Sequence, residues 1–444
     1  MALPVSQPVR ESNQMRDVVP ALDAGLNRRA FLKTSPLLAA TLAAPALPSR
    51  AQTGGAVRWC ATWGAAPAGP PPAASTQTFS GQTLRLVVRA SIGGGRVRIC
   101  VSNEMGSTPL RIGHASIALR SSGAAINATS LRELRFGGVA AIAIPAGAPA
   151  LSDPVDLPVP NQADLAISLY LPGSAQATTL HNAALQTSYV SPAGDYTSTI
   201  ALPVARTLGS WPFLTEVDVD AAVPCLVALG DSITDGQGSG ANANNRWPDY
   251  LARRLQASLG AAGNIGVVNR GISANLLLND YSTALLAGHD TLERFDRDVL
   301  ATAGVRYLIA FVGINDISYS PGSNPIPASE LIAGYRQLIA RAHARELSII
   351  GATLPPFEGF VYFTPAREGA RRAVNDWLRA SGEFDGLLDT DLALRSPASP
   401  TRMLPAYDSG DHLHPNNAGY LAIANAVPLA PFVSSSIARG EELA

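Results

Sequence analysis

The hydrophobic positions divide the chain into two regions with different periods. From about residue 55 to 215, short apolar runs alternate with polar residues and are separated by Gly, Pro, Asn or Asp. The strand candidates lie at 83–89, 96–101, 116–119, 140–144 and 165–171. Alternation with period two and frequent turns predicts an all-β, jelly-roll-like sandwich domain at 55–215. Three glycines at 93–95 predict a hairpin between the first two of these strands.

After about residue 221 the pattern changes to buried apolar runs that alternate with helical stripes. The strand candidates are at 225–229, 265–268, 307–312, 348–354 and 387–389, and the helix candidates at 247–259, 291–301, 328–344, 364–380 and 416–426. Continuous apolar strands are typical of a parallel sheet that is covered on both faces. The pattern therefore predicts an α/β domain at 221–435, with its site beyond the carboxyl ends of the strands.

The N-terminus carries the features of an export signal. Arg28 and Arg29 precede a weakly apolar run at 37–47, and small residues follow up to Ala51. This pattern predicts a twin-arginine signal peptide at 1–51, and hence a periplasmic or extracellular protein. The apolar run is too short to span a bilayer, so no transmembrane anchor is expected in the mature chain. The alternative interpretation is an N-terminal amphipathic helix.

Composition excludes several kinds of chemistry. The 444 residues have a formal net charge of −1 and only 15% charged residues, which argues against a nucleic-acid partner. Lys33 is the only lysine, so the mature chain has none for a Schiff base or a P-loop. Metal-ligand spacings such as C-x-x-C or H-E-x-x-H are absent, and neither a metal nor a cofactor is predicted. Cys60 and Cys100 could form a disulfide, whereas Cys225 is expected to be a buried apolar residue.

Ser232 is the candidate nucleophile. It follows the predicted strand at 225–229 and the turn residues Gly230 and Asp231, which places its hydroxyl at the carboxyl end of that strand. By itself this local sequence fits a serine beside a helix N-cap better than a nucleophile.

A second motif near the C-terminus favours the catalytic interpretation. Asp411 precedes His414 by three residues, a spacing that puts both side chains on one face of a turn. Asp411 can then accept the Nδ1 hydrogen of His414 and fix its tautomer, leaving Nε2 to act as a base. His412 is the nearest rival to His414.

Acyl transfer also needs hydrogen-bond donors for the developing oxyanion. Two predicted strands end in suitable residues: Gly271 follows the strand at 265–268, and Asn315 follows the strand at 307–312. A glycine or an asparagine after a strand is often only part of a turn. Here, however, all the candidates converge on one edge of one sheet.

These four segments, at 230–232, 269–271, 313–316 and 411–414, resemble in order the four sequence blocks of the SGNH (GDSL-type) hydrolases. The resemblance implies a flavodoxin-like α/β/α sandwich with a five-stranded parallel sheet and hydrolysis through an acyl-enzyme without a metal. It implies Ser232, Asp411 and His414 as the catalytic residues. It also implies an oxyanion hole made by the backbone amides of Ser232 and Gly271 and the side chain of Asn315. The first block reads Gly-Asp-Ser-Ile here, as in many members of the broader family.

The N-terminal region is similar to the β-sandwich that precedes this domain in some bacterial members, including carbohydrate acetylesterase-like ones, in its architecture and in stretches such as 101–103. The expected function is a secreted serine esterase that hydrolyses short-chain acyl or acetyl esters of a small molecule or a polysaccharide. The alternatives are an O-acyltransferase that uses the same site, a lysophospholipase or aryl esterase, and, less favoured, a non-catalytic glycan-binding protein.

An α/β-hydrolase is excluded because no G-x-S-x-G occurs. The aromatic loop at 355–364 either lines a substrate pocket or packs against the sheet edge. The oligomeric state stays open.

Overall fold

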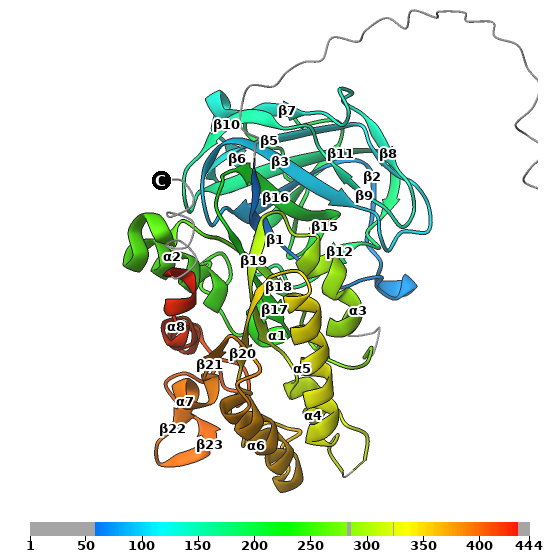
Figure 1. Ribbon diagram of the computed structural model, residues 1–444. Helices are drawn as coiled ribbons and strands as arrows, with labels where there is room; N and C mark the ends of the chain where they lie inside the picture. The colour runs from blue at the N-terminus through cyan, green and yellow to red at the C-terminus, as the bar shows by residue number, and fades with distance from the viewer. Residues whose placement is uncertain (1–57, 282–285, 323, 434–444) are drawn as a thin grey trace, which may run out of the picture. The chain divides into compact units, whose positions relative to one another are not determined.

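The computed structural model describes residues 58–281, 286–322 and 324–433, and the predicted export signal at 1–51 lies outside them. In the described residues, the N-terminal half consists mainly of two antiparallel sheets, and the C-terminal half is built on a parallel sheet with helices (Figure 1). No helix in these residues has the length and apolarity that a membrane crossing requires.

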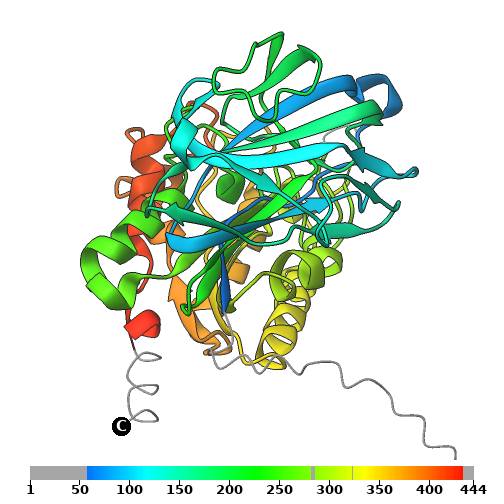
Figure 2. The ribbon, with the colours of Figure 1, turned by 90° about the horizontal axis from the view of Figure 1, so that it is seen from above.

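The two antiparallel sheets confirm the predicted sandwich-like region. One sheet has the order β1 (Trp59–Gly64), β16 (Leu214–Asp220), β3 (Gly94–Ser102) and β10 (Val155–Val159), and β9 (Pro149–Leu151) also pairs with β3. The other has the order β14 (Arg206–Leu208), β13 (Ser188–Ala193), β2 (Thr78–Arg89), β11 (Asp164–Gln176), β5 (His114–Ser122) and β6 (Ala125–Ile126), and β7 (Arg132–Leu134) also pairs with β5. Figure 2 shows the long strands of this region from above.

Short elements complete this half. Two further strand pairs are β4 (Leu110–Ile112) with β8 (Ile142–Ile144), and β12 (Leu180–His181) with β15 (Trp211–Pro212). Single 3₁₀ turns lie at Ala73–Ser75 and Ala128–Ser130. The pair β12–β15 carries a buried histidine, His181.

The hairpin predicted at the three glycines 93–95 is wrong. β2 pairs with β11 and β13, whereas β3 pairs with β9, β10 and β16, so the two strands belong to different sheets. Gly93 instead lies in the connection from one sheet of the sandwich to the other, and Gly94 and Gly95 are the first residues of β3. Gly93 is required there because a Cβ at this position would lie 2.1 Å from the carbonyl oxygen of Val159.

The C-terminal half confirms the predicted flavodoxin-like sheet. Five parallel strands lie in the order β18 (Gly266–Gly271), β17 (Cys225–Gly230), β19 (Val305–Phe311), β20 (Ser348–Ala352) and β21 (Gly386–Leu388). All six residues of β17 are buried, as expected for a central strand covered on both faces. β17, the first strand of this sheet in chain order, thus lies inside the sheet. The next strand, β18, lies on one side of β17, and the later strands β19, β20 and β21 follow on the other side.

Helices cover this sheet (Figure 1). They are α1 (Ser232–Asp235), α2 (Trp247–Leu259), α3 (Thr291–Phe295), α4 (Ile314–Ser318), α5 (Ala328–His343), α6 (Pro365–Ala380), α7 (Thr390–Leu394) and α8 (Asn417–Ala426), with a 3₁₀ turn at Gly260–Gly263, a π turn at Asp296–Leu300 and the strand pair β22 (Arg395–Ser396) and β23 (Ser399–Met403). α2 packs on α8, whereas α5 packs on α3 and α6. Pro365 in the first turn of α6 and the Thr364 N-cap explain why that helix begins where the sequence predicts.

The two halves share one hydrophobic core, which runs from the sandwich strands through β17 to α8. β1 contacts β18, and the amide of Ala61 donates to the carbonyl oxygen of Ala303 at 2.9 Å. Cys60, Cys100 and Cys225 are all free thiols, so the disulfide considered between Cys60 and Cys100 is not formed.

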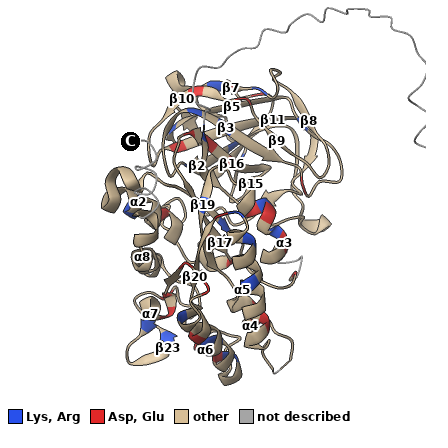
Figure 3. Ribbon diagram, in the orientation of Figure 1, with Lys and Arg blue, Asp and Glu red and all other residues tan. Residues whose placement is uncertain are grey.

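Charged side chains of both signs are mixed along the helices of the C-terminal half, as Figure 3 shows for α5 and α6. At the joint between the halves, buried Arg270 on β18 donates a hydrogen bond to Glu216 on β16. The same guanidinium donates to the carbonyl oxygens of Ala65 and Thr215, each at 2.9 Å. One buried arginine therefore ties the parallel sheet to the sandwich strands.

Candidate active site

The turn after β17 presents Ser232 at the carboxyl end of the strand. Asp231 is the N-cap of α1, and its Oδ1 accepts the amide of Ile233 at 3.0 Å. Gly230 has no room for a side chain, since a Cβ would lie 2.2 Å from Thr234 Oγ1 and 2.4 Å from the carbonyl oxygen of Phe311. Among the described residues, the amide of Ser232 has no hydrogen-bond acceptor.

Ser232, His414 and Asp411 form a continuous hydrogen-bonded chain. Ser232 Oγ lies 2.7 Å from His414 Nε2, and His414 Nδ1 lies 2.5 Å from Asp411 Oδ2. The other oxygen of Asp411 accepts the amides of Leu413 and His414 at 3.0 and 2.8 Å. A carboxylate on Nδ1 requires a hydrogen there, so Nε2 is the acceptor for the serine proton.

The surroundings keep Asp411 ionised. Burial acts to raise the pKa of Asp411, but hydrogen bonds from His414 and Leu413 and the charge of His414 outweigh it and hold the pKa well below its usual range. Ser232 and His414 are only 3% and 6% exposed. Ser232 and His414 are therefore shielded from water, whereas the Asp411 side chain is 40% exposed.

His412, the rival candidate, is engaged elsewhere. Its Nδ1 lies 2.6 Å from Asp408 Oδ2, and its backbone adopts φ +68°. The side chain is half exposed and makes no hydrogen bond to Ser232. Of the two histidines, His414 is thus the one that bonds Ser232.

Gly271 lies at the end of β18, but its amide is already used. It donates to Asn269 Oδ1 at 2.8 Å. A Cβ at Gly271 would lie 2.2 Å from the amide nitrogen of Asp235, so the glycine permits α1 to approach β18 closely. The predicted role of Gly271 as an oxyanion donor therefore does not fit the observed hydrogen bond.

Ala274, three residues later, has the unpaired amide that Gly271 lacks. It adopts φ +62°, and within the described residues its amide makes no hydrogen bond. Ser273 before it and Asn275 after it are both held by side-chain hydrogen bonds. The sequence carries no signal for this position, because alanine rarely adopts a left-handed backbone conformation.

Asn315 lies on α4, directly after β19. Its Nδ2 donates to the carbonyl oxygen of Asn275 at 3.0 Å, which leaves the second amide hydrogen for another acceptor. Ser232, Asn275 and Asn315 follow β17, β18 and β19, three neighbouring strands whose carboxyl ends meet at one edge of the sheet.

Arg294, which the sequence analysis did not single out, holds this edge together. The fully buried guanidinium donates to the carbonyl oxygen of Gly230 at 2.9 Å and to that of Arg270 at 2.8 Å. It also donates to Asn275 Oδ1 at 3.0 Å, and Asp298 neutralises it at 2.9 Å. One side chain thus fixes the ends of β17 and β18 and the loop that carries Ala274.

Two buried carboxyl groups lie in the segments that follow these strands: Asp231 after β17 and Asp316 on α4 after β19. Burial raises the pKa of Asp231 to about 7 and that of Asp316 to about 7. Backbone hydrogen bonds oppose the shift in each case, from Ile233 to Asp231 and from Leu277 and Leu278 to Asp316. Asp316 therefore anchors the loop after β18 from α4.

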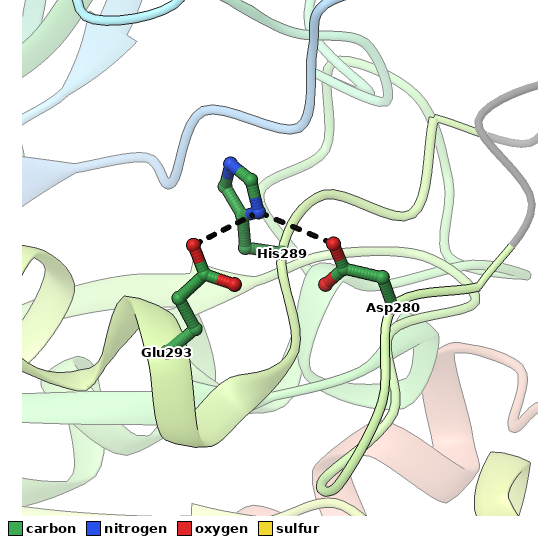
Figure 4. Close-up of side chains that lie close together, drawn as sticks. All are labelled: Asp280, His289 and Glu293. Atoms are coloured by element: carbon green, nitrogen blue, oxygen red, sulfur yellow. Dashed lines mark hydrogen bonds and ion pairs between the residues drawn. The ribbon is translucent and has the colours of Figure 1, made fainter. Parts of the chain in front are cut away.

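A separate group of side chains has metal-ligand chemistry. Asp280, His289 and Glu293 place one ligand atom each within 4.8 Å of one another (Figure 4). His289 Nδ1 lies 3.3 Å from Asp280 and 3.2 Å from Glu293. Both carboxylates lie against the one nitrogen Nδ1, and all three side chains are substantially exposed to solvent.

One comparison with known protein families covers the strand ends that carry these residues. A sequence model of the GDSL-like lipase/acylhydrolase family matches residues 228–422. Among curated proteins, none matches the chain.

Three solved structures illustrate the structural similarity. A catalytic mutant of an acetylxylan esterase from Geobacillus stearothermophilus is 24% identical, with 47% of this chain and 94% of that chain covered and a TM-score of 0.35. A GDSL-like lipase from Bacteroides thetaiotaomicron is 16% identical, with 49% and 88% covered and a TM-score of 0.32. An α/β hydrolase from the metagenome of Lake Arreo in Spain is 24% identical, with 48% and 96% covered and a TM-score of 0.35.

Residues 228–422 thus form a GDSL-like lipase/acylhydrolase (SGNH) domain, preceded by a β-rich N-terminal region. The protein is a carboxylic ester hydrolase.

Proposed function

We propose that Ser232 attacks the ester carbonyl while His414 takes its proton, and that Asp411 orients and stabilises the imidazolium. The alcohol then leaves with the proton from His414, and a water activated by the same histidine releases the acyl group from Ser232. The observation that carries this mechanism is the chain from Ser232 Oγ to His414 Nε2 at 2.7 Å and from Nδ1 to Asp411 at 2.5 Å.

The proposed oxyanion hole consists of the amides of Ser232 and Ala274 and the side-chain amide of Asn315. The first two have no acceptor among the described residues, and the third has one hydrogen left after its bond to Asn275. Ala274 takes the place of Gly271, whose amide donates to Asn269. Free donors held in a fixed position stabilise a developing oxyanion without further reorganisation.

The proposed substrates are short acyl esters, acetyl groups in particular, carried by a carbohydrate. Support comes from three tyrosines, Tyr281, Tyr319 and Tyr362, which we call the tyrosine cluster. Tyr319 stacks on Tyr281 with ring centroids 4.5 Å apart and meets Tyr362 edge-on at 5.2 Å. Burial raises the pKa of Tyr319 to about 12, with smaller contributions from Tyr281, Tyr362 and the charge of Asp231, which precedes the nucleophile.

The aromatic loop at 355–364 packs in part against the core, and its exposed Tyr362 is proposed to meet the substrate. Phe357 is fully buried, and Phe360 and Phe363 pack against the core, so these side chains serve packing. Tyr362 is 41% exposed and belongs to the tyrosine cluster. Exposed tyrosine rings combine an apolar face with a polar edge, a combination that suits the faces and hydroxyls of a sugar.

The mechanism is tested by turnover of p-nitrophenyl acetate with wild-type protein and the Ser232→Ala variant. Turnover that is equal in the two proteins contradicts the proposal. Acetate released into solution, rather than transferred to an added alcohol, distinguishes hydrolysis from acyl transfer. A series of esters of increasing acyl length then tests the preference for short chains.

The substrate class is tested with acetylated xylan, phenyl acetate and the Tyr362→Ala variant. Loss of a stacking ring should raise KM for acetylated xylan by about tenfold and leave p-nitrophenyl acetate nearly unchanged. Phe363→Ala is an unsuitable control because it disturbs the core, whereas Val361→Ala changes an exposed neighbour on the same loop. A larger effect on phenyl acetate than on the polysaccharide favours an aryl esterase.

We further propose that the protein is exported through the twin-arginine pathway. The support is the sequence around Arg28 and Arg29 with its modest apolar run and small residues up to Ala51. A fusion of residues 1–55 to a folded reporter should reach the periplasm, and replacing both arginines by lysine should retain it in the cytoplasm. Export of the lysine variant at the wild-type level contradicts this pathway.

A further inference from the structure

A buried histidine of the sandwich region contacts Asp235, the last residue of the short helix α1 that begins with Ser232. His181 is the last residue of β12, the strand that pairs with β15. Its Nδ1 lies 2.9 Å from the carbonyl oxygen of Ala66, and its Nε2 lies 2.9 Å from Asp235 Oδ1. Both partners are acceptors, so a doubly protonated imidazolium satisfies both contacts.

Several charged groups face this histidine. Burial acts to lower the pKa of His181, but the charge of Asp235 and the hydrogen bonds to Asp235 and Ala66 outweigh it and raise the pKa above its ordinary value. Arg246, paired with Asp249 at 2.7 Å, acts in the opposite direction. The ring of Trp211 covers His181 with centroids 5.6 Å apart. The side chains of His181 and Asp235 are only 5% and 2% exposed.

Asp235 connects His181 to the loop after β18. It is the last residue of α1, the short helix that begins at Ser232. While its Oδ1 accepts from His181, its Oδ2 accepts the amide of Ser273 at 3.0 Å and the hydroxyl of Ser273 at 2.7 Å. Both carboxylate oxygens are therefore committed, one to each half of the molecule.

Ser273 immediately precedes Ala274, the residue with the unpaired amide. A left-handed conformation at a non-glycine residue, as Ala274 adopts, is unfavourable and persists only where the neighbouring contacts enforce it. On the following side, Asn275 is fixed by Arg294 at 3.0 Å and by Thr291 at 2.8 Å. On the preceding side, the contacts of Ser273 with Asp235 serve this purpose, and His181 is the buried group that orients Asp235.

We propose that His181 is a positioning residue for ester hydrolysis, which acts through Asp235 and Ser273 to aim the amide of Ala274 at the oxyanion. This inference rests on the proposed function. It assigns the sandwich region a part in catalysis: that region supplies a side chain that the catalytic half lacks. The donor itself stays on the loop after β18.

The test compares three variants in the full chain. His181→Phe keeps a ring but removes both donors, His181→Gln keeps one donor, and Ser273→Ala removes only the hydroxyl contact to Asp235. The matched control is His114→Phe, since His114 also lies on a strand of the sandwich region and also pairs with an aspartate, Asp195, but is largely exposed. The probe is p-nitrophenyl acetate, with kcat and KM determined separately and melting temperature measured for each protein.

Displacement of an oxyanion donor affects the transition state more than ground-state binding. His181→Phe should lower kcat by about 10- to 100-fold with KM changed by less than about threefold. His181→Gln should recover a large part of this loss, and Ser273→Ala should lower kcat by about three- to tenfold. The double variant His181→Phe/Ser273→Ala should lose no more than His181→Phe, because both changes act on one chain of contacts.

Wild-type kcat in a folded His181→Phe protein overturns the proposal, as does a loss that His181→Gln does not recover. If His181→Phe does not fold, unchanged kcat in both His181→Gln and Ser273→Ala overturns it. Losses that merely multiply in the double variant also contradict a single chain. Failure of the proposed function is recognised separately, because wild-type turnover then equals that of Ser232→Ala.

Discussion

The parallel sheet and the antiparallel sandwich differ in how they reach the candidate site. The parallel sheet brings the ends of three neighbouring strands together, and the residues after β17, β18 and β19 carry Ser232, Ala274 and Asn315. The sandwich region contributes two buried side chains that contact the parallel half. His181 bonds Asp235, and Glu216 accepts a hydrogen bond from Arg270. One region thus holds the groups proposed to react, and the other contacts the segments on which they lie.

This comparison predicts that the largest effects come from the reacting groups of the parallel sheet. His414→Ala should lower kcat for p-nitrophenyl acetate by about 10⁴-fold or more, because the serine then loses its base. His412→Ala, two residues earlier, should retain kcat within about threefold, as its ring bonds Asp408. A greater loss at His412 than at His414 would assign the base to the other histidine.

The next effect concerns a donor that acts only in the transition state. Asn315→Ala should lower kcat by about 10²–10³-fold with little change in KM. Thermal unfolding checks that the variant stays folded, since the Asn315 side chain also bonds the carbonyl oxygen of Asn275. A near-normal kcat would remove Asn315 from the oxyanion hole.

Breaking the contact between Arg270 and Glu216, at the joint between the regions, should affect stability more than catalysis. Glu216→Ala leaves the buried guanidinium of Arg270 without its acidic partner and should lower the free energy of unfolding by about 3 kcal/mol. Urea unfolding measures this change. Glu383→Ala breaks the exposed pair with Arg336 and should lower the free energy of unfolding far less, because water and salt screen an exposed ion pair. Equal costs for the two variants would mean that the buried contact contributes no more than a surface ion pair.

A further effect concerns the slope of stability against pH. The pKa of Asp231 is raised by burial to about 7, above the unfolded value of about 3.9. The folded state therefore holds a proton that the unfolded chain releases, so this group lowers stability as pH rises from about 4 to about 7. Asp231→Asn keeps an acceptor for Ile233 and should remove up to about 1.4 kcal/mol per pH unit of this decline.

Stability curves at several pH values measure this change, with Asp316 retained in both proteins. Its pKa is also raised to about 7, so a part of the decline should persist in Asp231→Asn. A variant with the same slope as the wild type would show that Asp231 is ionised in the folded protein throughout this range.

The two regions also differ in how far the sequence predicts them. The helix predicted at 247–259 has the observed bounds Trp247–Leu259, and the apolar run at 225–229 lies within β17, Cys225–Gly230. In the sandwich, the strand positions were mostly found, but the pairing of β2 with β3 was wrong. Period and turn residues locate a strand, whereas its partner depends on contacts between segments far apart in the chain.

The same distinction applies to the site. The sequence suffices to propose Ser232, Asp411, His414 and Asn315, because each belongs to a motif of fixed spacing after a strand or in a turn. Gly271 was selected by the same reasoning, yet its lack of a side chain serves the close approach of Asp235. A glycine after a strand indicates that space is limited, but does not reveal which backbone occupies it.

From the sequence alone, the apolar periods determine the two regions, and the four short motifs determine the class of chemistry, because both depend on neighbours in the chain. Only the tertiary structure decides that the amide of Ala274 is unpaired and that His181 bonds Asp235, the residue that holds Ser273. The left-handed backbone of Ala274 and the contact between His181 and Asp235, 54 positions apart, arise when the sandwich packs beside the parallel sheet. No local pattern encodes such contacts, since they are enforced by buried groups from both regions at once.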